Sequence, residues 1–413
     1  MRHFPLGFNP VENGVNLMAH LPDRAHRLDR LPTYRFAVIG QRIQEMNATG
    51  KDVIRVDIGS PDLPPPDAVV ESLKRSASNP ANHQYGSYRG DAGFRQAVAD
   101  YYQRRFGVTL DPYREVLPLI GSKEGLINLT MAYIDRGDTA IVPDIAYPAY
   151  RMGAMMAGGT VLELPLDASR GYLPDFNAIQ GDLSTAKLLW VNYPNNPTGA
   201  IADLAFYKKA LDFCREYDLL LCSDNPYCEL VFEGYVAPSA LQVPGALERT
   251  VEFTSFSKTF NMAGWRLGAC VGPREAIDAL LTVKSNVDSG YWKAIFDAGS
   301  TALNTTPQSW LDARNARYNA RREKILALLP EIGLEAFKTP ASLYVWARVL
   351  DGDEQRYVDR ALEEGLVALT PGTMYGDAGK GYVRFSLGIA DERLEEALAR
   401  LRKWYQIYHV EVA

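Results

Sequence analysis

The sequence predicts an α/β protein: a large domain with a mostly parallel central sheet covered by helices, and a smaller α+β domain. From about residue 115 to 275, short apolar runs alternate with segments of helical periodicity. Strands that are apolar throughout and separated by amphipathic helices are typical of a parallel sheet buried on both faces. The chain has 413 residues, more than one hydrophobic core usually serves, so two domains are expected.

Six apolar runs are the predicted strands of the large domain, in chain order TAIVP, TVLEL, AKLLWVNY, LLLCS, VEFTS and LGACVG. A helix is predicted between the third and fourth runs, where apolar side chains recur at helical spacing at Leu204, Tyr207, Leu211 and Cys214. From about residue 291 the pattern changes, and the strand-like GYVRFSLGI is followed by DERLEEALARLRKWYQIY, which has one apolar helical face. The stiff segment SPDLPPP (60–66) is a predicted crossing between the domains.

Composition excludes several classes of function. The formal charge of −6 is spread over mixed acidic and basic residues, so no nucleic-acid partner is predicted. The four cysteines form no CxxC pair and have no histidine at metal-ligand spacing, which indicates reduced thiols and no metal site. The first thirty residues lack the apolar stretch of a signal peptide, and no run of eighteen apolar residues follows. A cytoplasmic enzyme without a membrane partner is therefore expected.

Polar side chains follow three consecutive predicted strands. Asn196 lies in PNNPTG after the first of them, Asp224 and Tyr227 lie in DNPY after the second, and Lys258 lies in SFSKTFNMAGWRLG after the third. Ligands of parallel sheets bind beyond the carboxyl ends of the strands. We therefore expect an amide, a carboxylate, a phenol and a lysine to meet in one crevice.

Schiff-base chemistry explains this combination. A lysine amine condenses with an aldehyde cofactor, a carboxylate keeps a pyridine nitrogen protonated, and neutral donors address a phenolate oxygen of the ring. Burial and the positive charge of Arg266 would lower the pKa of Lys258 and so favour the nucleophilic amine. Each residue alone has an ordinary alternative, such as a solvated lysine or a helix cap, so the interpretation depends on their coincidence.

An anion site is predicted from IGSKEGLINLTMAY. Gly121 permits close backbone approach, and the helix after it directs free N–H groups towards an anion. A clamp for a phosphate would then consist of Ser122, Lys123, Ser255, Ser257 and Arg266. Tyr147, which follows the strand TAIVP, is predicted to stack on a flat ring, with core packing as the alternative.

These motifs resemble those of the class I/II pyridoxal 5'-phosphate (PLP)-dependent aminotransferases of fold type I, from about residue 30 to the end of the chain. The resemblance implies that Lys258 carries PLP, that Asp224 pairs with the pyridine nitrogen, that Asn196 and Tyr227 contact the phenolate oxygen, and that Tyr147 stacks on the ring. It also implies an N-terminal arm (1–30), a small domain (31–60 and 291–413) and a large PLP-binding domain (61–290).

The resemblance assigns a substrate site and a partner as well. Arg384, in GYVRFSLG, matches the arginine that grips the substrate α-carboxylate, and Gly59 would leave room for that group. Tyr85 matches a tyrosine that reaches the cofactor phosphate of the other subunit in a homodimer. The substrate pocket, where Asn196 also lies, would be lined by Tyr34 and by Asn286 from the partner subunit.

The implied reaction moves an α-amino group between an amino acid and a 2-oxo acid. The strings DVIRVDIGSPDLPPP, LIGSKEGL and VKSNVDSG are most similar to members that exchange amino groups between LL-diaminopimelate and glutamate in lysine biosynthesis. Three alternatives stay open: an aminotransferase for aspartate, alanine or another amino acid, a PLP-dependent C–S β-lyase, and a non-catalytic PLP-binding protein.

Overall fold

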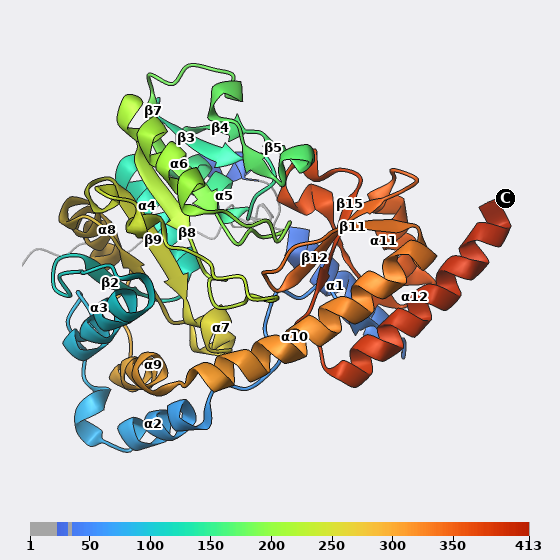
Figure 1. Ribbon diagram of the computed structural model, residues 1–413, viewed down its shortest axis with the longest axis horizontal. Coiled ribbons are helices and arrows are strands. Elements are labelled where there is room, and N and C mark those ends of the chain that lie inside the picture. Colours follow the sequence, from blue (N-terminus) through green and yellow to red (C-terminus); the bar gives the residue numbers. More distant parts are fainter. Residues whose placement is uncertain (1–22, 32–34, 413) are drawn as a thin grey trace, which may run out of the picture.

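A seven-stranded sheet forms the centre of the computed structural model, which describes residues 23–31 and 35–412 (Figure 1). The strand order is β2-β10-β9-β8-β7-β3-β4. The strands are β2 (Val116–Leu119), β3 (Thr139–Pro143), β4 (Thr160–Leu164), β7 (Ala186–Asn192), β8 (Leu220–Asp224), β9 (Thr250–Ser255) and β10 (Gly268–Val271). All neighbours are parallel except β10, which runs antiparallel to β2 and β9. The expectation of a mostly parallel sheet is confirmed.

Helices cover both faces of this sheet. The helices α4 (Ser122–Tyr133), α5 (Ala149–Ala157) and α8 (Arg274–Val287) share one hydrophobic core with alternate residues of the strands. On the other face lie α6 (Leu204–Glu216) and α3 (Ala92–Phe106). Nearly every residue of β3, β7, β8 and β9 is buried because both faces are covered, and this explains their continuous apolar runs, whereas the edge strand β4 buries only Leu164.

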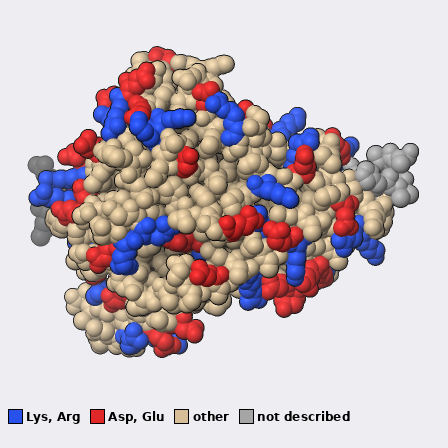
Figure 2. Space-filling view, in the orientation of Figure 1, with Lys and Arg blue, Asp and Glu red and all other residues tan. Residues whose placement is uncertain are grey.

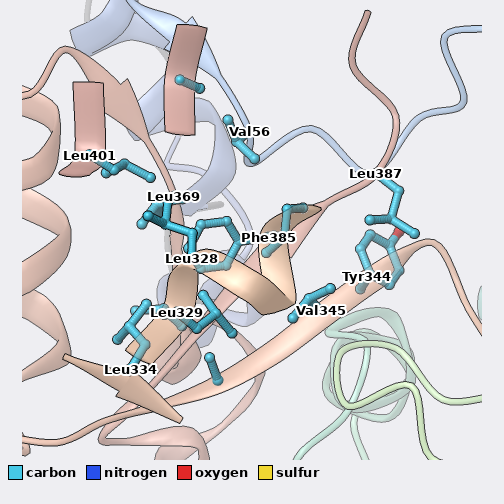
Figure 3. Packing of buried hydrophobic residues seen from close by; sticks show 14 of the residues in the cluster. Val56, Leu328, Leu329, Leu334, Tyr344, Val345, Leu369, Phe385, Leu387 and Leu401 are labelled. Carbon is cyan, nitrogen blue, oxygen red and sulfur yellow. The ribbon is translucent and has the colours of Figure 1, made fainter. Parts of the chain in front are cut away.

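A second, antiparallel sheet has the order β11-β12-β15-β14. Its strands are β11 (Leu334–Phe337), β12 (Tyr344–Val349), β14 (Thr370–Pro371) and β15 (Tyr382–Ser386). A large cluster of buried side chains packs between this sheet and its helices, and Figure 3 shows Val345, Phe385 and Leu401 among its members. The helices beside it are α1 (Arg35–Ala48), α10 (Gln308–Leu328), α11 (Glu354–Glu363) and α12 (Asp391–Val412).

Several segments connect the two sheets. The long helix α10 extends from the region of α9 (Lys293–Thr305) towards the second sheet (Figure 1). The helix α9 itself packs against α2 (Asp67–Ala77) and α3, beside the first sheet. Short pairings of β1 (Ile54–Arg55) with β13 (Val367–Ala368), and of β5 (Leu166–Asp167) with β6 (Leu173–Pro174), complete the strands. The domain boundaries given above stay a prediction.

The surface and the thiols have ordinary features. Acidic and basic side chains are interspersed on the face shown in Figure 2. All four cysteines are buried and unpaired. Among the described helices, none combines the length and the apolarity needed to cross a membrane.

Candidate active site

The carboxyl ends of β7, β8 and β9 meet at one edge of the central sheet. Asn192, the last residue of β7, pairs in register with Asp224, the last residue of β8, and Asp224 pairs with Phe253 of β9. The short helix α7 (Phe256–Thr259) begins directly after β9 and carries Lys258. A cavity of about 440 Å³ opens at this edge.

Most of the residues singled out in the sequence line this cavity. They are Gly59, Ser122, Lys123, Tyr147, Asn196, Asp224, Tyr227, Ser255, Ser257, Lys258, Arg266 and Arg384. They come from the ends of the large sheet, from the start of α4 and from β15 of the second sheet, so the cavity lies between the two sheets. A concave site of this size with a few converging polar groups is typical of a cofactor or small-ligand site.

The Lys258 side chain reaches from α7 into the cavity, and its Nζ donates a hydrogen bond to the carbonyl oxygen of Gly59. Burial lowers the pKa of this amine, and the guanidinium charges of Arg384 and Arg266 act in the same direction. The expectation that Arg266 disfavours the charged lysine agrees with this arrangement. A larger fraction of the neutral, nucleophilic amine is the chemical consequence.

Asp224 is 4% exposed, and only one of its two carboxyl oxygens has a hydrogen-bond partner among the described residues. Its Oδ2 accepts a hydrogen bond of 2.5 Å from the hydroxyl of Tyr150, whereas Oδ1 has no hydrogen-bond partner among the described residues. Burial raises the pKa of Asp224 to about 7, although the Tyr150 hydrogen bond opposes the shift. A buried carboxylate oxygen without a partner fits a protonated pyridine nitrogen, which would supply both a hydrogen bond and a positive charge.

The start of α4 and the Arg266 side chain form a site for an anion. Gly121 adopts a left-handed φ of 74° and approaches the Arg266 guanidinium so closely that a side chain there would displace it. The guanidinium donates to neutral groups: Nη1 donates to the Ser257 hydroxyl (3.3 Å) and to the Ala263 carbonyl (2.9 Å). A guanidinium with neutral partners at a helix N-terminus suits a phosphate.

Arg384 is another cationic group of the cavity and is 2% exposed. Its Nη1 donates to the side-chain oxygen of Asn196 (2.9 Å), and its Nη2 donates to the main-chain carbonyl of Asp57 (2.7 Å). Its Nε has no partner among the described residues. Because a buried guanidinium with neutral partners is costly, this geometry favours an anionic ligand such as a carboxylate.

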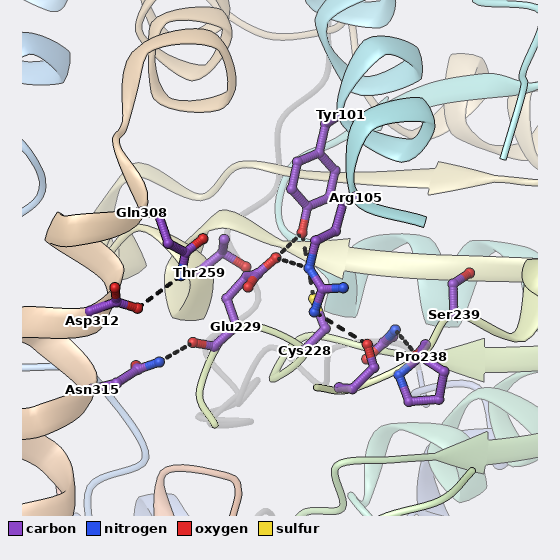
Figure 4. Close-up of polar contacts among 12 residues, drawn as sticks. Tyr101, Arg105, Cys228, Glu229, Pro238, Ser239, Thr259, Gln308, Asp312 and Asn315 are labelled. Carbon is purple, nitrogen blue, oxygen red and sulfur yellow. Dashed lines mark hydrogen bonds and ion pairs between the residues drawn. The ribbon is translucent and has the colours of Figure 1, made fainter. Parts of the chain in front are cut away.

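A buried arginine holds the backbone of the turn that bears Lys258. Arg314 of α10 donates hydrogen bonds to the main-chain carbonyls of Lys258 (3.2 Å), Thr259 and Glu229. Figure 4 shows the adjoining network, in which the Glu229 carboxylate accepts from the Tyr101 hydroxyl (2.6 Å). Through Arg314, helix α10 therefore connects the turn that bears Lys258 with the segment that follows β8.

Two of the described residues that were expected at the site do not line this cavity. Tyr85 is 90% exposed and does not line it. Asn286 is exposed on α8, where its side-chain amide donates to the carbonyl of Thr282 (2.8 Å). Both were assigned to the site of a partner subunit, so their roles stay predictions. Tyr34 lies outside the described residues.

The sequence interpretation missed other residues of the cavity, among them Asn192, Asp57 and Tyr344. Asn192 could have been found, since it ends a predicted strand, and its amide donates to the Asp224 carbonyl (2.7 Å). Asp57 and Tyr344 gave no local signal. Tyr344 lies in the apolar string LYVW, where an aromatic residue indicates only a strand core.

Comparisons with known proteins agree with this geometry. The model of the family described as aminotransferase class I and II matches residues 51–401. The chain is 47% identical over 381 residues to an LL-diaminopimelate aminotransferase of Moorella thermoacetica, which covers 92% of this chain and 97% of that protein. It is 44% identical over 378 residues to the LL-diaminopimelate aminotransferase of Aquifex aeolicus, with 91% and 97% of the two chains covered.

A solved structure of similar architecture is that of substrate-bound BacF from Bacillus subtilis. It superposes with a TM-score of 0.88 at 36% sequence identity and covers 93% of this chain and 98% of that chain.

Proposed function

This chain belongs to the class I and II aminotransferases, PLP-dependent enzymes that act on amino acids and 2-oxo acids, and from this premise we propose that its substrates are LL-diaminopimelate and glutamate. In the proposed reaction, LL-diaminopimelate and 2-oxoglutarate exchange an amino group, giving glutamate and the oxo acid that cyclises to tetrahydrodipicolinate. The observation that carries the proposal is the 47% identity to an LL-diaminopimelate aminotransferase over almost its whole length. The reverse direction would serve lysine biosynthesis.

We assign the cofactor contacts from the cavity. PLP supplies an aldehyde that a lysine amine can hold and a ring that withdraws electrons from the substrate. Lys258 would bind the aldehyde, and Oδ1 of Asp224 would hold the proton on the ring nitrogen. Tyr147 would stack on the ring, while Asn196 and Tyr227 would donate to its phenolate oxygen. The phosphate would lie against Ser122, Lys123, Ser255, Ser257 and Arg266.

The protein side chains then divide the chemistry between them. Arg384 would bind the substrate α-carboxylate, because its guanidinium has neutral partners in a buried position. Once displaced, the Nζ of Lys258 would take the proton from the substrate Cα and deliver it to the cofactor carbon that had carried the aldehyde. The lowered pKa of this amine supports a role as a base near neutral pH.

We further propose a cytoplasmic homodimer in which Tyr85 reaches the phosphate of the other subunit. Tyr85 is 90% exposed and is therefore accessible to another subunit. The substrate pocket would be completed by Tyr34 and by Asn286 of the partner subunit. The N-terminal arm (1–30), the small domain (31–60 and 291–413) and the large domain (61–290) belong to the same proposal.

Half-reactions of the purified enzyme test the substrate assignment. The PLP form is mixed with LL-diaminopimelate, glutamate, aspartate, alanine or methionine, and conversion to pyridoxamine phosphate is followed by absorbance. We expect LL-diaminopimelate and glutamate to react fastest. No conversion with LL-diaminopimelate would remove that substrate, and release of pyruvate from cystathionine without a 2-oxo acid would indicate a β-lyase.

A pair of lysine variants tests the cofactor assignment. Lys258→Ala should abolish the absorption band of the lysine-linked cofactor and the activity. Lys208→Ala is the matched control, because Lys208 is an exposed lysine of α6 paired with Asp212. Retention of the band in Lys258→Ala would refute the role of Lys258.

A further inference from the structure

Tyr344 contacts two of the proposed active-site residues with two different parts of its side chain. It is the first residue of β12 and is 3% exposed. The Arg384 guanidinium lies over its ring, with Cζ 4.0 Å from the ring centroid. Its hydroxyl lies 3.1 Å from the hydroxyl of Tyr227. One side chain thus links the residue proposed to grip the substrate with a residue proposed to contact the cofactor.

The aromatic ring compensates a buried charge. Arg384 donates hydrogen bonds to the side-chain oxygen of Asn196 and to the main-chain carbonyl of Asp57, and both acceptors are neutral. The face of an aromatic ring is electron-rich and attracts a cation most strongly where water is excluded. The ring of Tyr375 also lies near this guanidinium, but at 5.1 Å. The Tyr344 ring is therefore the nearer of the two aromatic rings to the guanidinium.

The hydroxyl is held in place by its surroundings. Tyr344 belongs to the hydrophobic cluster beneath the second sheet, and Figure 3 shows it beside Val345 and Leu387. Gly59 leaves the space for the hydroxyl, since a Cβ at this position would lie 2.5 Å from the Tyr344 oxygen. Burial raises the pKa of Tyr344, but nearby Lys258 and Arg384, together with the hydrogen bond to Tyr227, hold this pKa below its usual value.

We propose that Tyr344 is a positioning residue with two separable actions: its ring orients Arg384 for the substrate α-carboxylate, and its hydroxyl orients the hydroxyl of Tyr227. The first action determines substrate affinity. The second determines turnover and leaves affinity nearly unchanged. The proposal rests on the proposed roles of Arg384 and Tyr227.

Two substitutions separate the actions. Tyr344→Phe keeps the ring and removes the hydroxyl, whereas Tyr344→Leu removes both. Tyr344→Met is a second variant without a ring, and its flexible side chain fills the space if the leucine variant does not fold. Tyr217→Phe is the control for the tyrosine-to-phenylalanine change, because Tyr217 is exposed at the end of α6 and does not line the cavity.

Ligand affinity is measured without turnover. The holoenzyme is titrated calorimetrically with α-methylglutamate, which carries an α-carboxylate but has no α-hydrogen to lose. We expect Tyr344→Phe to bind within about twofold of the wild type, and the leucine or methionine variant to bind about tenfold or more weakly. Equal weakening by phenylalanine and leucine, or none by leucine, would overturn the role of the ring.

Steady-state kinetics test the hydroxyl. Tyr344→Phe should lower kcat about fivefold, the size of one ordinary hydrogen bond, with the KM for glutamate nearly unchanged. An unchanged kcat would overturn the role of the hydroxyl. Failure of the proposed function has a different signature: the cofactor band would survive in Lys258→Ala. If wild-type protein that carries this band does not bind α-methylglutamate, the assignment of Arg384 and the present proposal both fall.

Discussion

Asp224→Asn should stabilise the cofactor-free protein at alkaline pH and weaken cofactor binding at the same time. In the folded protein the Asp224 carboxyl is buried, and one of its oxygens has no hydrogen-bond partner among the described residues. Asparagine has nearly the same shape and carries no charge, and its side-chain oxygen can still accept the hydrogen bond from Tyr150. The substitution thus removes the buried charge while the packing is kept.

The magnitude follows from the pKa of Asp224, which burial raises from its ordinary value of 3.8 to about 7. The folded state therefore binds this proton more tightly than the unfolded state does. The free energy of unfolding falls as pH rises from about 4 to about 7, and the loss is complete above the folded pKa. At about 1.4 kcal/mol per pH unit, the loss amounts to roughly 4 kcal/mol. Asp224→Asn has no carboxyl at this position, so its stability does not show this loss.

Urea unfolding of the cofactor-free proteins at pH 5 and pH 8 measures the effect, at one fixed protein concentration. The stability of Asp224→Asn relative to the wild type should be greater at pH 8 than at pH 5. Asp312→Asn, on the exposed side of α10, should show no such difference. The same relative stability of Asp224→Asn at both pH values would refute the raised pKa.

PLP should favour the wild type over Asp224→Asn, which is the opposite of the order of stability expected for the cofactor-free proteins at alkaline pH. A protonated pyridine nitrogen would pair with the Asp224 carboxylate and stabilise its charged form, and asparagine offers no charge for this pair. The affinity for PLP and the turnover should therefore fall in Asp224→Asn. Undiminished PLP affinity would contradict the proposed contact between Asp224 and the ring nitrogen.

Three further substitutions follow from the same contacts. Gly121→Ala should weaken PLP binding at least about tenfold, because the new methyl group strains a left-handed backbone and displaces Arg266; fluorescence titration with PLP measures it. Arg314→Met should lower the free energy of unfolding by about 2–4 kcal/mol, since the carbonyls of Lys258 and Thr259 lose this donor and that of Glu229 keeps only Asn315; an unchanged urea midpoint would contradict this. Tyr150→Phe removes a donor to Asp224 and should raise the pKa of that carboxyl further, so that the fall in apoprotein stability extends to higher pH in urea titrations.

Local chemistry made much of the site predictable. Lys258, Asp224 and Asn196 each follow a strand whose apolar run is visible in the sequence, and adjacent parallel strands bring their ends together. The phosphate clamp was predicted for a similar reason, because the glycine before α4 and the arginine after α7 belong to short strings with recognisable spacing. The structure gathers these residues in one cavity.

Contacts between distant segments were not predictable in the same way. The antiparallel direction of β10 was not foreseen, because a strand buried on both faces has the same apolar pattern in either direction. The partnership of Tyr344 with Arg384 was missed as well, since two neighbouring strands of the second sheet have to pair before the ring lies beneath the guanidinium.

The sequence by itself determined the parallel layer of strands and helices, the chemical type of the site and the residues at the strand ends, because these depend on periodicity and on residue types at short spacing. Only the tertiary structure decided that β15 brings Arg384 to the Lys258 cavity, that Tyr344 and Arg314 support them, and that one oxygen of Asp224 has no hydrogen-bond partner among the described residues. Burial and pairing across long sequence separations set those contacts and the pKa values that follow from them, and no local pattern encodes such distances.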